Sequence, residues 1–572
     1  MDGVDVYRND AIDGPSDVIH HGVLDHEKGL LIAASKRHES ANVDEFLLLV
    51  GEYGRGQKCL TFFLCLFMFG ATYNILSTVF VTLNSSWRCS AYGFTQGACI
   101  YNGTIDENNK LYEKRCEINR TAWEFEREAS YSIVTEFDLV CDRKVFAEVA
   151  KSASFLGGAI GTIILGILSD RYGRKPILFA SYFIVVSGSL IQSFATTIHI
   201  FIIIRSVVGL CLFGVLPVIY IILVELVGPK KRALVTHMIW IAFALSACLL
   251  SVQAYYVQKW RTLIRIITAP YLVPILFWRL IPESIRWLRV NQRTEEAEKI
   301  LKNIARFNKI EFPDAKLQEI AACEKKVSMK VIFQKKKRIF LILSHGVLWC
   351  IYAIIYYGIS SATTYFSNNV YTDFFVVSAV NFPAVGFSVY GCNRFGRRKT
   401  TMAATFSTLI LLVVIAVIPV TTENGYNEYS AIRSSLGVLA KFFISISYSS
   451  IYLLSGETYA TVIRSRVICM LEFLMLIGGA TAPWLSTGLH QIHARLPFPI
   501  MATLCALAGW ITTMLKETKD TPTPELLDDR KASTRIKSLV DNVRDSHSIS
   551  SSRTGSENRL SLIYDAKQTT VL

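Results

Sequence analysis

The chain has 572 residues, of which 51% are apolar, 12% are aromatic and 19% are charged. Soluble domains carry about 25% charged residues, so this composition favours a chain that contacts lipid. The net charge of +14 is interrupted by long apolar runs, which argues against binding to nucleic acid. The sequence contains no Walker loop, G-x-S-x-G elbow, H-E-x-x-H helix or Cys/His zinc spacing. We therefore expect no ATP-driven pumping, no hydrolase chemistry, no cofactor and no metal.

Apolar windows long enough to cross a bilayer recur along the chain in two series of six. A spanning helix needs about 20 apolar residues. The first series comprises 58–88, 151–170, 175–205, 205–225, 232–259 and a weaker window after Trp260. The second series comprises 338–373, 373–394, 399–423, 434–456, a window around Glu472, and 495–516. They predict an all-α polytopic membrane protein with twelve transmembrane helices in two six-helix halves.

These windows also divide the chain into segments. We expect an N-terminal tail over 1–58, a first half over 59–281 and a second half over 338–515. A long loop, 84–143, lies inside the first half. Residues 282–337 link the halves and carry Glu and Lys at helical spacing. The tail 516–572 is rich in Ser, Lys and Asp, and we expect it to be largely disordered.

Basic residues gather at the even-numbered junctions between the windows. Examples are Lys175 after the second window, the run 335–338 after the sixth and Lys399 after the eighth. Because positive charge marks cytoplasmic loops, we expect both termini in the cytoplasm and the loop 84–143 outside.

The predicted outer loop carries two kinds of signal for the secretory pathway. Asn84, Asn102 and Asn119 each begin an N-x-S/T glycosylation acceptor. We expect at least one to be used, although such triplets also occur by chance and Asn84 lies close to the membrane. Four cysteines in an oxidising compartment suggest up to two disulfides, with three possible pairings. They are Cys89, Cys99, Cys116 and Cys141.

The two halves carry the same short motifs between their windows, in the same order. The Asp-Arg-x-Gly-Arg-Lys segment after the second window returns after the eighth with Asn in place of Asp, and Pro-Glu-Ser at 282–284 parallels Lys-Glu-Thr at 516–518. Parallel repeats of six spans place the substrate between the halves near the midplane. Gly permits a tight turn and the charges can pair with helix ends, so we interpret the motif as a conformational switch as well as a topology signal. Its residues are Asp170, Arg171, Gly173, Arg174, Lys175, Glu225, Arg232, Arg394, Gly396, Arg397, Glu457 and Arg464.

The chain ends in Thr569-Thr570-Val571-Leu572, with a hydroxyl at the third-last position and an apolar last residue. This pattern fits strand addition to a PDZ groove, so we consider a PDZ-domain protein as a partner.

Several strings resemble a known family. Gly166-x3-Asp-Arg-x-Gly-Arg-Lys175 resembles the major facilitator signature. Val-Gly-Glu-Tyr-Gly-Arg at 50–55, Ser-Ile-Val-Thr-Glu-Phe-Asp-Leu-Val-Cys at 132–141 and Pro-Glu-Ser-Ile-Arg-Trp-Leu at 282–288 resemble the organic cation, anion and carnitine transporters, solute carrier family twenty-two. The resemblance covers about 45–530. It implies the major facilitator fold, a plasma-membrane location and transport of organic ions without ATP.

The resemblance also implies which side chains line the substrate cavity. In the family, aromatic residues of spans four, five and seven do so, and the matching positions are Tyr220, Phe243, Tyr356 and Tyr357. Aromatic faces attract organic cations by about 0.5–2 kcal/mol each. Packing between helices or against lipid is, however, the commoner fate of an aromatic residue in a membrane.

Ionisable residues inside the spans are further candidates, because burying a charge there costs several kcal/mol unless it is compensated. Lys441 in the tenth window and Glu472 in the eleventh can pair, either as a structural link or as a pair that substrate opens. Where this chain has Leu476, cation transporters have Asp and anion or carnitine transporters have Arg. Where it has Asn381, relatives have Glu. Glu472, one turn before Leu476, is our candidate for the counter-ion of a cation.

Together these features favour a transporter of small organic cations that works by alternating access in a lipid bilayer. Two alternatives stay open, namely transport of organic anions or carnitine-like zwitterions, and a transport-incompetent relative that acts as a sensor or scaffold. An enzyme would need a catalytic cluster at the bilayer surface, which the sequence lacks, so we expect no enzymatic activity.

Overall fold

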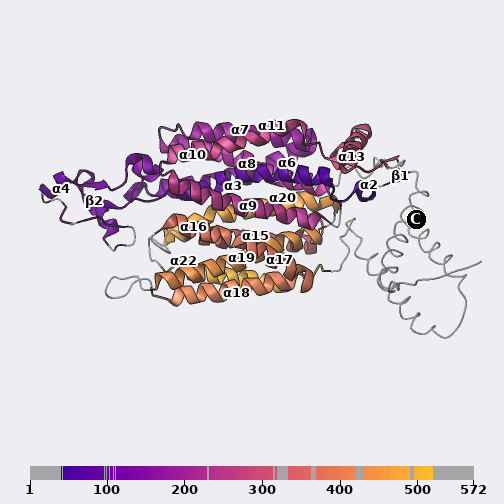
Figure 1. The fold of residues 1–572 in the computed structure, drawn as a ribbon. Helices are drawn as coiled ribbons and strands as arrows, with labels where there is room; N and C mark the ends of the chain where they lie inside the picture. The colour runs from indigo at the N-terminus through magenta and orange to yellow at the C-terminus, as the bar shows by residue number, and fades with distance from the viewer. Residues whose placement is uncertain are drawn as a thin grey trace, which may run out of the picture.

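In a computed structural model, long helices run side by side and build most of the chain (Figure 1). The structure describes residues 40–519 except 42, 96, 98, 102, 107–108, 110, 229–230, 313–315, 318–332, 363–368, 420–428, 460 and 490–494. Within these residues, 12 helical segments are long and apolar enough to cross a membrane. The predicted twelve-helix fold class is confirmed.

The first half contains six spanning segments. The sixth was the weakest window in the sequence, and it is broken into short pieces around Pro270 and Pro274. Each proline lacks a backbone N–H and therefore interrupts the helical hydrogen bonds. In chain order the pieces of this half are α3 (Arg55–Val81), α6 (Val145–Tyr172), α7 (Arg174–Gln192), α8 (Ile198–Leu226), α9 (Arg232–Tyr256), α10 (Trp260–Thr268), η6 (Ala269–Tyr271), α11 (Leu272–Leu276) and η7 (Phe277–Arg279).

The second half repeats this arrangement. Its eighth span is divided at Val380, and its eleventh continues past Pro483 as a short π-helix. In chain order its elements are α15 (Lys336–Ala362), α16 (Val370–Ala379), α17 (Asn381–Arg394), α18 (Arg397–Val417), α19 (Ser430–Thr458), α20 (Thr461–Pro483), η10 (Trp484–Gly488) and α22 (Pro497–Met514).

Small elements gather at the two ends of the bundle (Figure 1). We call the end with the segment 82–144 the loop end, and the opposite end the linker end. The loop end holds β2 (Trp87–Cys89), which pairs antiparallel with β3 (Trp123–Phe125), and short helices. The helices are α4 (Ala91–Thr95), η1 (Tyr112–Glu117), η2 (Arg120–Ala122), η3 (Ala129–Tyr131), α5 (Ile133–Glu136) and η4 (Cys141–Arg143).

The linker end joins the N-terminal segment to the segment between the halves. Helix α2 (Val43–Val50) packs against α13 (Thr294–Asn308), which follows α12 (Ile285–Val290). Strands β1 (Ser40–Ala41) and β4 (Lys316–Leu317) pair in parallel beside them. The side chain of Asn308 donates to the carbonyl of Val50 at 2.9 Å and accepts from the amide of Gly56 at 2.9 Å. The linker helix is thus tied to the start of the first span.

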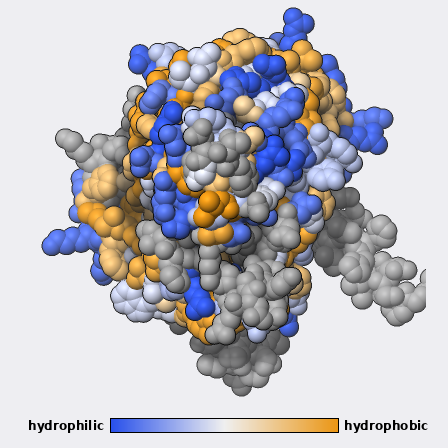
Figure 2. All heavy atoms as spheres, turned by 90° about the vertical axis from the view of Figure 1, so that its left-hand side faces the viewer, coloured by the Kyte–Doolittle hydropathy of each residue, from blue (hydrophilic) through white to orange (hydrophobic). Residues whose placement is uncertain are grey.

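Buried apolar side chains of both halves form one continuous core, and a second core around Trp87 and Trp123 supports the loop end. Between the halves, α6 packs on α20 and α9 packs on α16. Hydrophilic residues gather over the loop end, whereas hydrophobic residues appear around its periphery (Figure 2). This distribution suits a bundle whose sides meet lipid and whose end meets water.

Glycines allow α6 and α8 to approach each other closely. A Cβ atom on Gly157 would lie 2.0 Å from the carbonyl oxygen of Ser206, and one on Gly161 would lie 1.9 Å from that of Leu210. Small residues at such crossings are typical of membrane helices, which associate through close packing because lipid offers no hydrophobic driving force.

We predict that Gly161→Ala destabilises the protein by about 1–3 kcal/mol, because the added methyl group collides with backbone rather than with a flexible side chain. Thermal unfolding of the purified full chain in detergent measures the effect. Gly386→Ala in α17 is the matched control, since a Cβ there meets no atom within 4 Å. A control that unfolds as early as Gly161→Ala would contradict the packing argument.

Candidate functional site

A cavity of about 130 Å³ lies between the halves, in the part of the bundle nearest the loop end. Its walls come from the last turns of α3, α15 and α20 and the first turns of α6. Aromatic rings of Phe155 and Tyr357 face it from opposite halves, and Tyr131 reaches it from the loop. Among the described residues that line it, only Lys151 is charged. Its Nζ pairs with Glu148 of the same helix at 2.8 Å, so the local net charge is small.

Behind the cavity wall lies a second lysine, Lys441 of α19, which is 1% exposed. Its Nζ donates to the carbonyl of Tyr356 at 2.9 Å and to the hydroxyl of Ser360 at 2.8 Å, and it lies over the Tyr356 ring. Ser360 itself lines the cavity. In the described part of the chain no carboxylate lies within 4 Å of this ammonium group. Dipoles and an aromatic face therefore compensate its charge.

The predicted pairing of Lys441 with Glu472 is wrong in this structure. Lys441 lies about 17 residues from the linker-end terminus of α19, whereas Glu472, in the middle of the antiparallel helix α20, lies about 11 residues from the linker-end terminus of that helix. At 1.5 Å of rise per residue, the two positions are roughly 10 Å apart along the bundle. Lys441 therefore bonds to α15 instead.

An aromatic layer separates the cavity from the linker end. It consists of Trp240 in α9, Trp349 and Tyr356 in α15, and Tyr448 and Tyr452 in α19. The ring centroid of Trp240 lies 5.7 Å from that of Tyr448 and 5.5 Å from that of Tyr452, so the layer joins the two halves. Trp349 lies 4.0 Å from Tyr452, and Tyr356 stacks 5.1 Å from Tyr448.

Glu472 lies beside this layer. It precedes Met475 by three residues on α20, and the Met475 sulfur accepts hydrogen bonds from Tyr448 at 2.7 Å and Tyr452 at 3.3 Å. Residues three apart share a helix face, so the carboxyl group points to the same side. It is half-buried and lies near Tyr452. A carboxylate and several ring faces thus converge on one region between the halves.

Of the residues proposed from the sequence to contact substrate, only Tyr357 lines the cavity directly. Its ring centroid lies 4.9 Å from that of Phe155 in the other half. Tyr356 belongs to the aromatic layer, and Phe243 is buried with its ring 5.9 Å from Trp240. Tyr220 is 38% exposed and lies near Tyr452.

Several residues of the site were not anticipated from the sequence. Tyr448 and Tyr452 follow Lys441 by seven and eleven residues, so one helix face carries all three, and this spacing is a signal that could have found them. No comparable pattern marks Phe155, and Tyr131 ends the short 3-10 helix η3, whose position depends on the tertiary fold.

Asn381, where relatives carry Glu, has a structural partner set of its own. Its amide oxygen accepts from the hydroxyl of Ser445 at 2.8 Å and from that of Tyr356 at 3.4 Å. It therefore helps to hold the Tyr356 ring of the aromatic layer in place without adding charge. Leu476, the other position where this chain lacks the charged residue expected from the resemblance, is buried among apolar side chains.

At the linker end, a carboxylate holds the turn between α6 and α7. Gly173 adopts φ +107°, and a Cβ there would lie 2.4 Å from Glu283, so the turn requires glycine for both conformation and space. The Glu283 carboxylate accepts from the backbone N–H groups of Arg174 at 2.9 Å and Lys175 at 3.3 Å. It thus caps the start of α7, where a negative charge is favourable.

Two further contacts complete this turn. Arg174 pairs with Asp170 at 2.8 Å, and Ser284, next to the capping carboxylate, donates to Glu225 at the end of α8. These contacts tie the linker-end termini of three spans of the first half together.

The second half repeats this arrangement. Gly396 adopts φ +106°, and Glu517 accepts from the backbone of Arg397 at 2.8 Å. Glu457 pairs with the Arg397 guanidinium at 2.9 Å and accepts from Thr518 at 2.6 Å. Each of these contacts joins residues of one half or of the segment directly after it, so the motif braces each half internally.

The remaining residues of the motif have simpler surroundings. Arg171 lies over the ring of its neighbour Tyr172, and Arg394 is exposed. The Arg464 Nε donates to the carbonyl of Tyr459 at 3.2 Å. Arg232 begins α9, and its side chain lies outside the described residues. A switching role for the motif stays a prediction.

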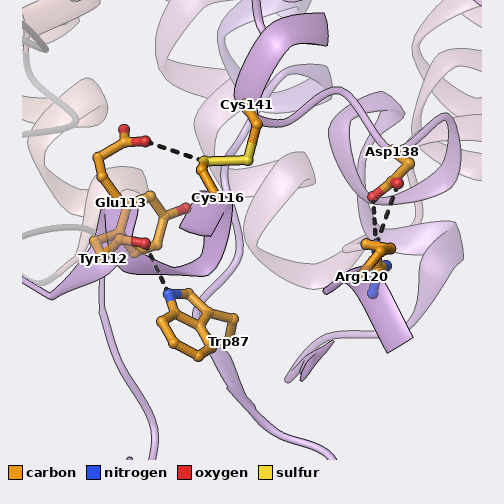
Figure 3. Close-up of a disulfide and its surroundings, with 7 residues drawn as sticks. All are labelled: Trp87, Tyr112, Glu113, Cys116, Arg120, Asp138 and Cys141. Atoms are coloured by element: carbon orange, nitrogen blue, oxygen red, sulfur yellow. Dashed lines mark hydrogen bonds and ion pairs between the residues drawn. A yellow bond between two sulfur atoms is a disulfide. The ribbon is translucent and has the colours of Figure 1, made fainter. Parts of the chain in front are cut away.

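The loop contains two disulfides. The structure pairs Cys89 with Cys99 and Cys116 with Cys141, which is one of the three pairings open from the sequence. The second bridge attaches η1 to the start of the second span (Figure 3).

Side-chain contacts support this bridge. In the same view the Trp87 indole N–H donates to the carbonyl of Tyr112 at 3.0 Å, and Arg120 pairs with Asp138 at 3.0 Å.

The three glycosylation candidates differ in their surroundings. Asn84 lines the cavity, which leaves little room for a glycan. Asn119 is exposed, and its side-chain oxygen accepts from the amide of Thr121 at 3.3 Å, in the third position of the same triplet. Asn102 and the C-terminal PDZ-binding candidate lie outside the described residues.

Outside the membrane spans, Glu517 shows how the capping turns depend on charge. Burial alone would raise the pKa of this carboxyl group, but backbone N–H donors outweigh burial and hold the pKa below its ordinary value. Those donors belong to Lys519, Arg397, Arg398 and Thr518.

We predict that Glu517→Gln lowers the melting temperature at pH 7. Because the pKa is lowered in the folded state, the carboxylate stabilises the fold above about pH 4.3, the ordinary value, and this contribution is lost as the pH falls through the lowered pKa. The difference from the wild type should therefore shrink on acidification. The exposed Glu295→Gln in α13 is the control and should change little. A gap that is constant from pH 7 to pH 4 would refute the capping role.

Comparison with known proteins shows which family this chain is similar to. Residues 58–526 match the family described as sugar (and other) transporter. An organic cation transporter-like protein of Drosophila melanogaster is 30% identical over 533 residues, which cover 85% of this chain and 92% of that protein. Solute carrier family 22 member 4 of Mus musculus is 26% identical, covering 85% and 94%. Organic anion transporter 3 of Oryctolagus cuniculus is 30% identical, covering 70% and 74%.

Among solved structures, the xylose transporter XylE from E. coli, in a partially occluded inward-open conformation, aligns with a TM-score of 0.55 at 14% identity, covering 81% of this chain and 99% of that one. This likeness shows the fold. The family match spans most of the chain and confirms the resemblance inferred from its sequence strings. The protein is thus a multi-pass membrane transporter of small organic solutes and not an enzyme, and the chain belongs to the sugar (and other) transporter family of the major facilitator superfamily, within the solute carrier family twenty-two branch.

Proposed function

We propose that the protein transports small organic cations by alternating access, through facilitated diffusion or exchange. The observation that carries this proposal is the position of Glu472 beside the aromatic layer. Ring faces attract ammonium groups by about 0.5–2 kcal/mol each, and more where water is excluded. A half-buried carboxylate supplies the counter-charge, and the rings also pack against the apolar body of an organic ion.

Contacts between the halves on both sides of the cavity support alternating access. On the loop side, the hydroxyl of Ser152 donates to the carbonyl of Ala480 at 2.7 Å, and Ser251 donates to the carbonyl of Tyr371. On the linker side, Trp240 closes the space against α19. Since the capping turns brace each half, opening one side requires only that one of these sets of contacts separates.

We further propose that the loop end faces the outside of the plasma membrane and that both termini are cytoplasmic. The basic residues of the linker end support this orientation. The disulfides of the loop suit an oxidising compartment. Exposed Asn119 is the glycosylation acceptor that fits best.

Transport of organic anions or zwitterions is the second candidate, and Lys441 favours it. This ammonium group lies behind the cavity wall without a carboxylate within 4 Å in the described chain. A substrate carboxylate that displaced the Ser360 hydroxyl would reach it. For a zwitterion, Lys441 and Glu472 would bind opposite ends of one molecule.

Uptake by cells that express the full chain distinguishes these candidates. We predict saturable uptake of tetraethylammonium, reduced about 10- to 100-fold by Glu472→Gln, because a hydrogen-bonded or paired charge contributes about 1.5–3 kcal/mol. Lys441→Gln should leave cation uptake within about threefold, since its charge does not attract a cation. Glu124→Gln in the exposed loop strand β3 is the matched control, and surface expression is measured for every variant.

Other outcomes assign the alternatives. Uptake of para-aminohippurate alone, lost in Lys441→Gln, would replace the cation proposal by the anion candidate. Carnitine uptake that needs both Lys441 and Glu472 would indicate a zwitterion. Normal surface expression without saturable flux of any of the three would favour the sensor or scaffold reading.

A further inference from the structure

A buried arginine lies inside the first half, away from the aromatic layer. Arg205 of α8 is 2% exposed, and its Nη2 donates to the carbonyl of Asn74 and the hydroxyl of Thr78 in α3. No carboxylate lies within 4 Å of the guanidinium in the described chain. A full positive charge at this depth costs several kcal/mol unless something compensates it. Two neutral oxygens compensate it only in part.

Hydrogen-bond donors without acceptors surround this arginine. The Nε of Arg205, the hydroxyl of Tyr182 and the amide nitrogen of Gln192 are buried and have no partner within the described chain, and the hydroxyl of Tyr271 has only the backbone of Asn74 beside it. Each of these residues is at most 2% exposed. The unpaired acceptors nearby are the side-chain oxygen of Asn74 and the phenolic oxygens, and all of them are neutral. Leaving a buried polar group unsatisfied costs about 1–3 kcal/mol, so these unpaired groups beside an arginine charge need an explanation such as a bound water or ion.

These donors lie in one neighbourhood. The ring centroids of Tyr182 and Tyr271 are 6.3 Å apart, and a Cβ on Gly70 would lie 2.4 Å from the Tyr182 hydroxyl. Asn74, whose carbonyl receives the Arg205 hydrogen bond, lies one turn after Gly70 on the same face of α3. Tyr271 also lies near Arg205.

Gln192 approaches the cluster from α7. Asn74 donates to the hydroxyl of Ser189 at 2.6 Å, and Gln192 lies one turn after Ser189. The Ser189 hydroxyl in turn donates to the carbonyl of Val185 at 2.7 Å. It is therefore committed as a donor and offers the cluster no spare proton.

We infer that this cluster binds a small monovalent inorganic anion, with chloride as the expected occupant. An anion accepts from several donors at once and offsets the arginine charge, whereas a water molecule brings donors of its own and leaves the charge uncompensated. The same donors would therefore be satisfied more completely by an anion than by water.

This anion site is separate from the substrate region. Thr78 lines the cavity, and Arg205 contacts Thr78 from behind the cavity wall without lining the cavity itself. The proposed binding is independent of which organic ion the protein transports. Its test can therefore use stability rather than uptake as the readout, and failure of either proposal leaves the other standing.

The experiment is thermal unfolding of the full chain, purified in detergent, during titration of sodium chloride into sodium gluconate at constant ionic strength. A ligand that binds only the folded state raises its stability by RT ln(1 + [L]/Kd). We expect a saturable rise in melting temperature, and we expect bromide to reproduce it. Tyr182→Phe removes one donor with little change in shape. It should raise the chloride concentration needed for half-saturation several-fold, and the variant should fold normally in gluconate.

Tyr256→Phe, at an exposed position near the end of α9, is the matched control and should titrate like the wild type. Equal melting temperatures in chloride and gluconate would overturn the inference. So would a chloride effect that Tyr182→Phe and Tyr271→Phe both leave unchanged, since the anion would then bind elsewhere.

Discussion

Inside a bilayer a helix satisfies its own backbone hydrogen bonds, and every other polar group must find a partner within the protein. This constraint governs where charge lies in the chain. Most charged residues are at the two ends of the bundle. Three charged residues within the spans have different surroundings. Lys441 is held by a carbonyl, a hydroxyl and a ring, Arg205 is held by the last turns of α3, and Glu472 faces the space between the halves.

The capping turns explain how such a molecule can move without losing its structure. Glu283 and Glu517 occupy equivalent positions, and each accepts hydrogen bonds from the first amides of the following span. Because these contacts stay within a half, the motif makes each half a unit. In the proposed alternating access, the contacts that change are those between the halves, which include the packing of α6 on α20, that of α9 on α16 and the aromatic contacts of Trp240.

The fold was largely predictable from the sequence, because span length and charge asymmetry are set by the bilayer and leave a direct record in composition. The repeat was predictable because the turns at Gly173 and Gly396 both require glycine, so the same motif appears in both halves of the sequence. The site was only partly predictable. Which face Lys441 turns to, and the distance between it and Glu472, depend on how antiparallel helices are placed against each other. Tyr131 reaches the cavity from the three-residue helix η3, which is too short to leave a periodic pattern in the sequence.

The participation of the loop in the cavity wall has a consequence beyond transport chemistry. Tyr131 and Asn84 make the wall of the cavity at the loop end continuous with the disulfide-linked loop. In the proposed orientation, with the loop end outside, a macromolecule too large to enter the cavity, such as an antibody raised against the loop, would contact residues continuous with the cavity wall. An inhibitor that acts from that side would then not need to resemble the substrate.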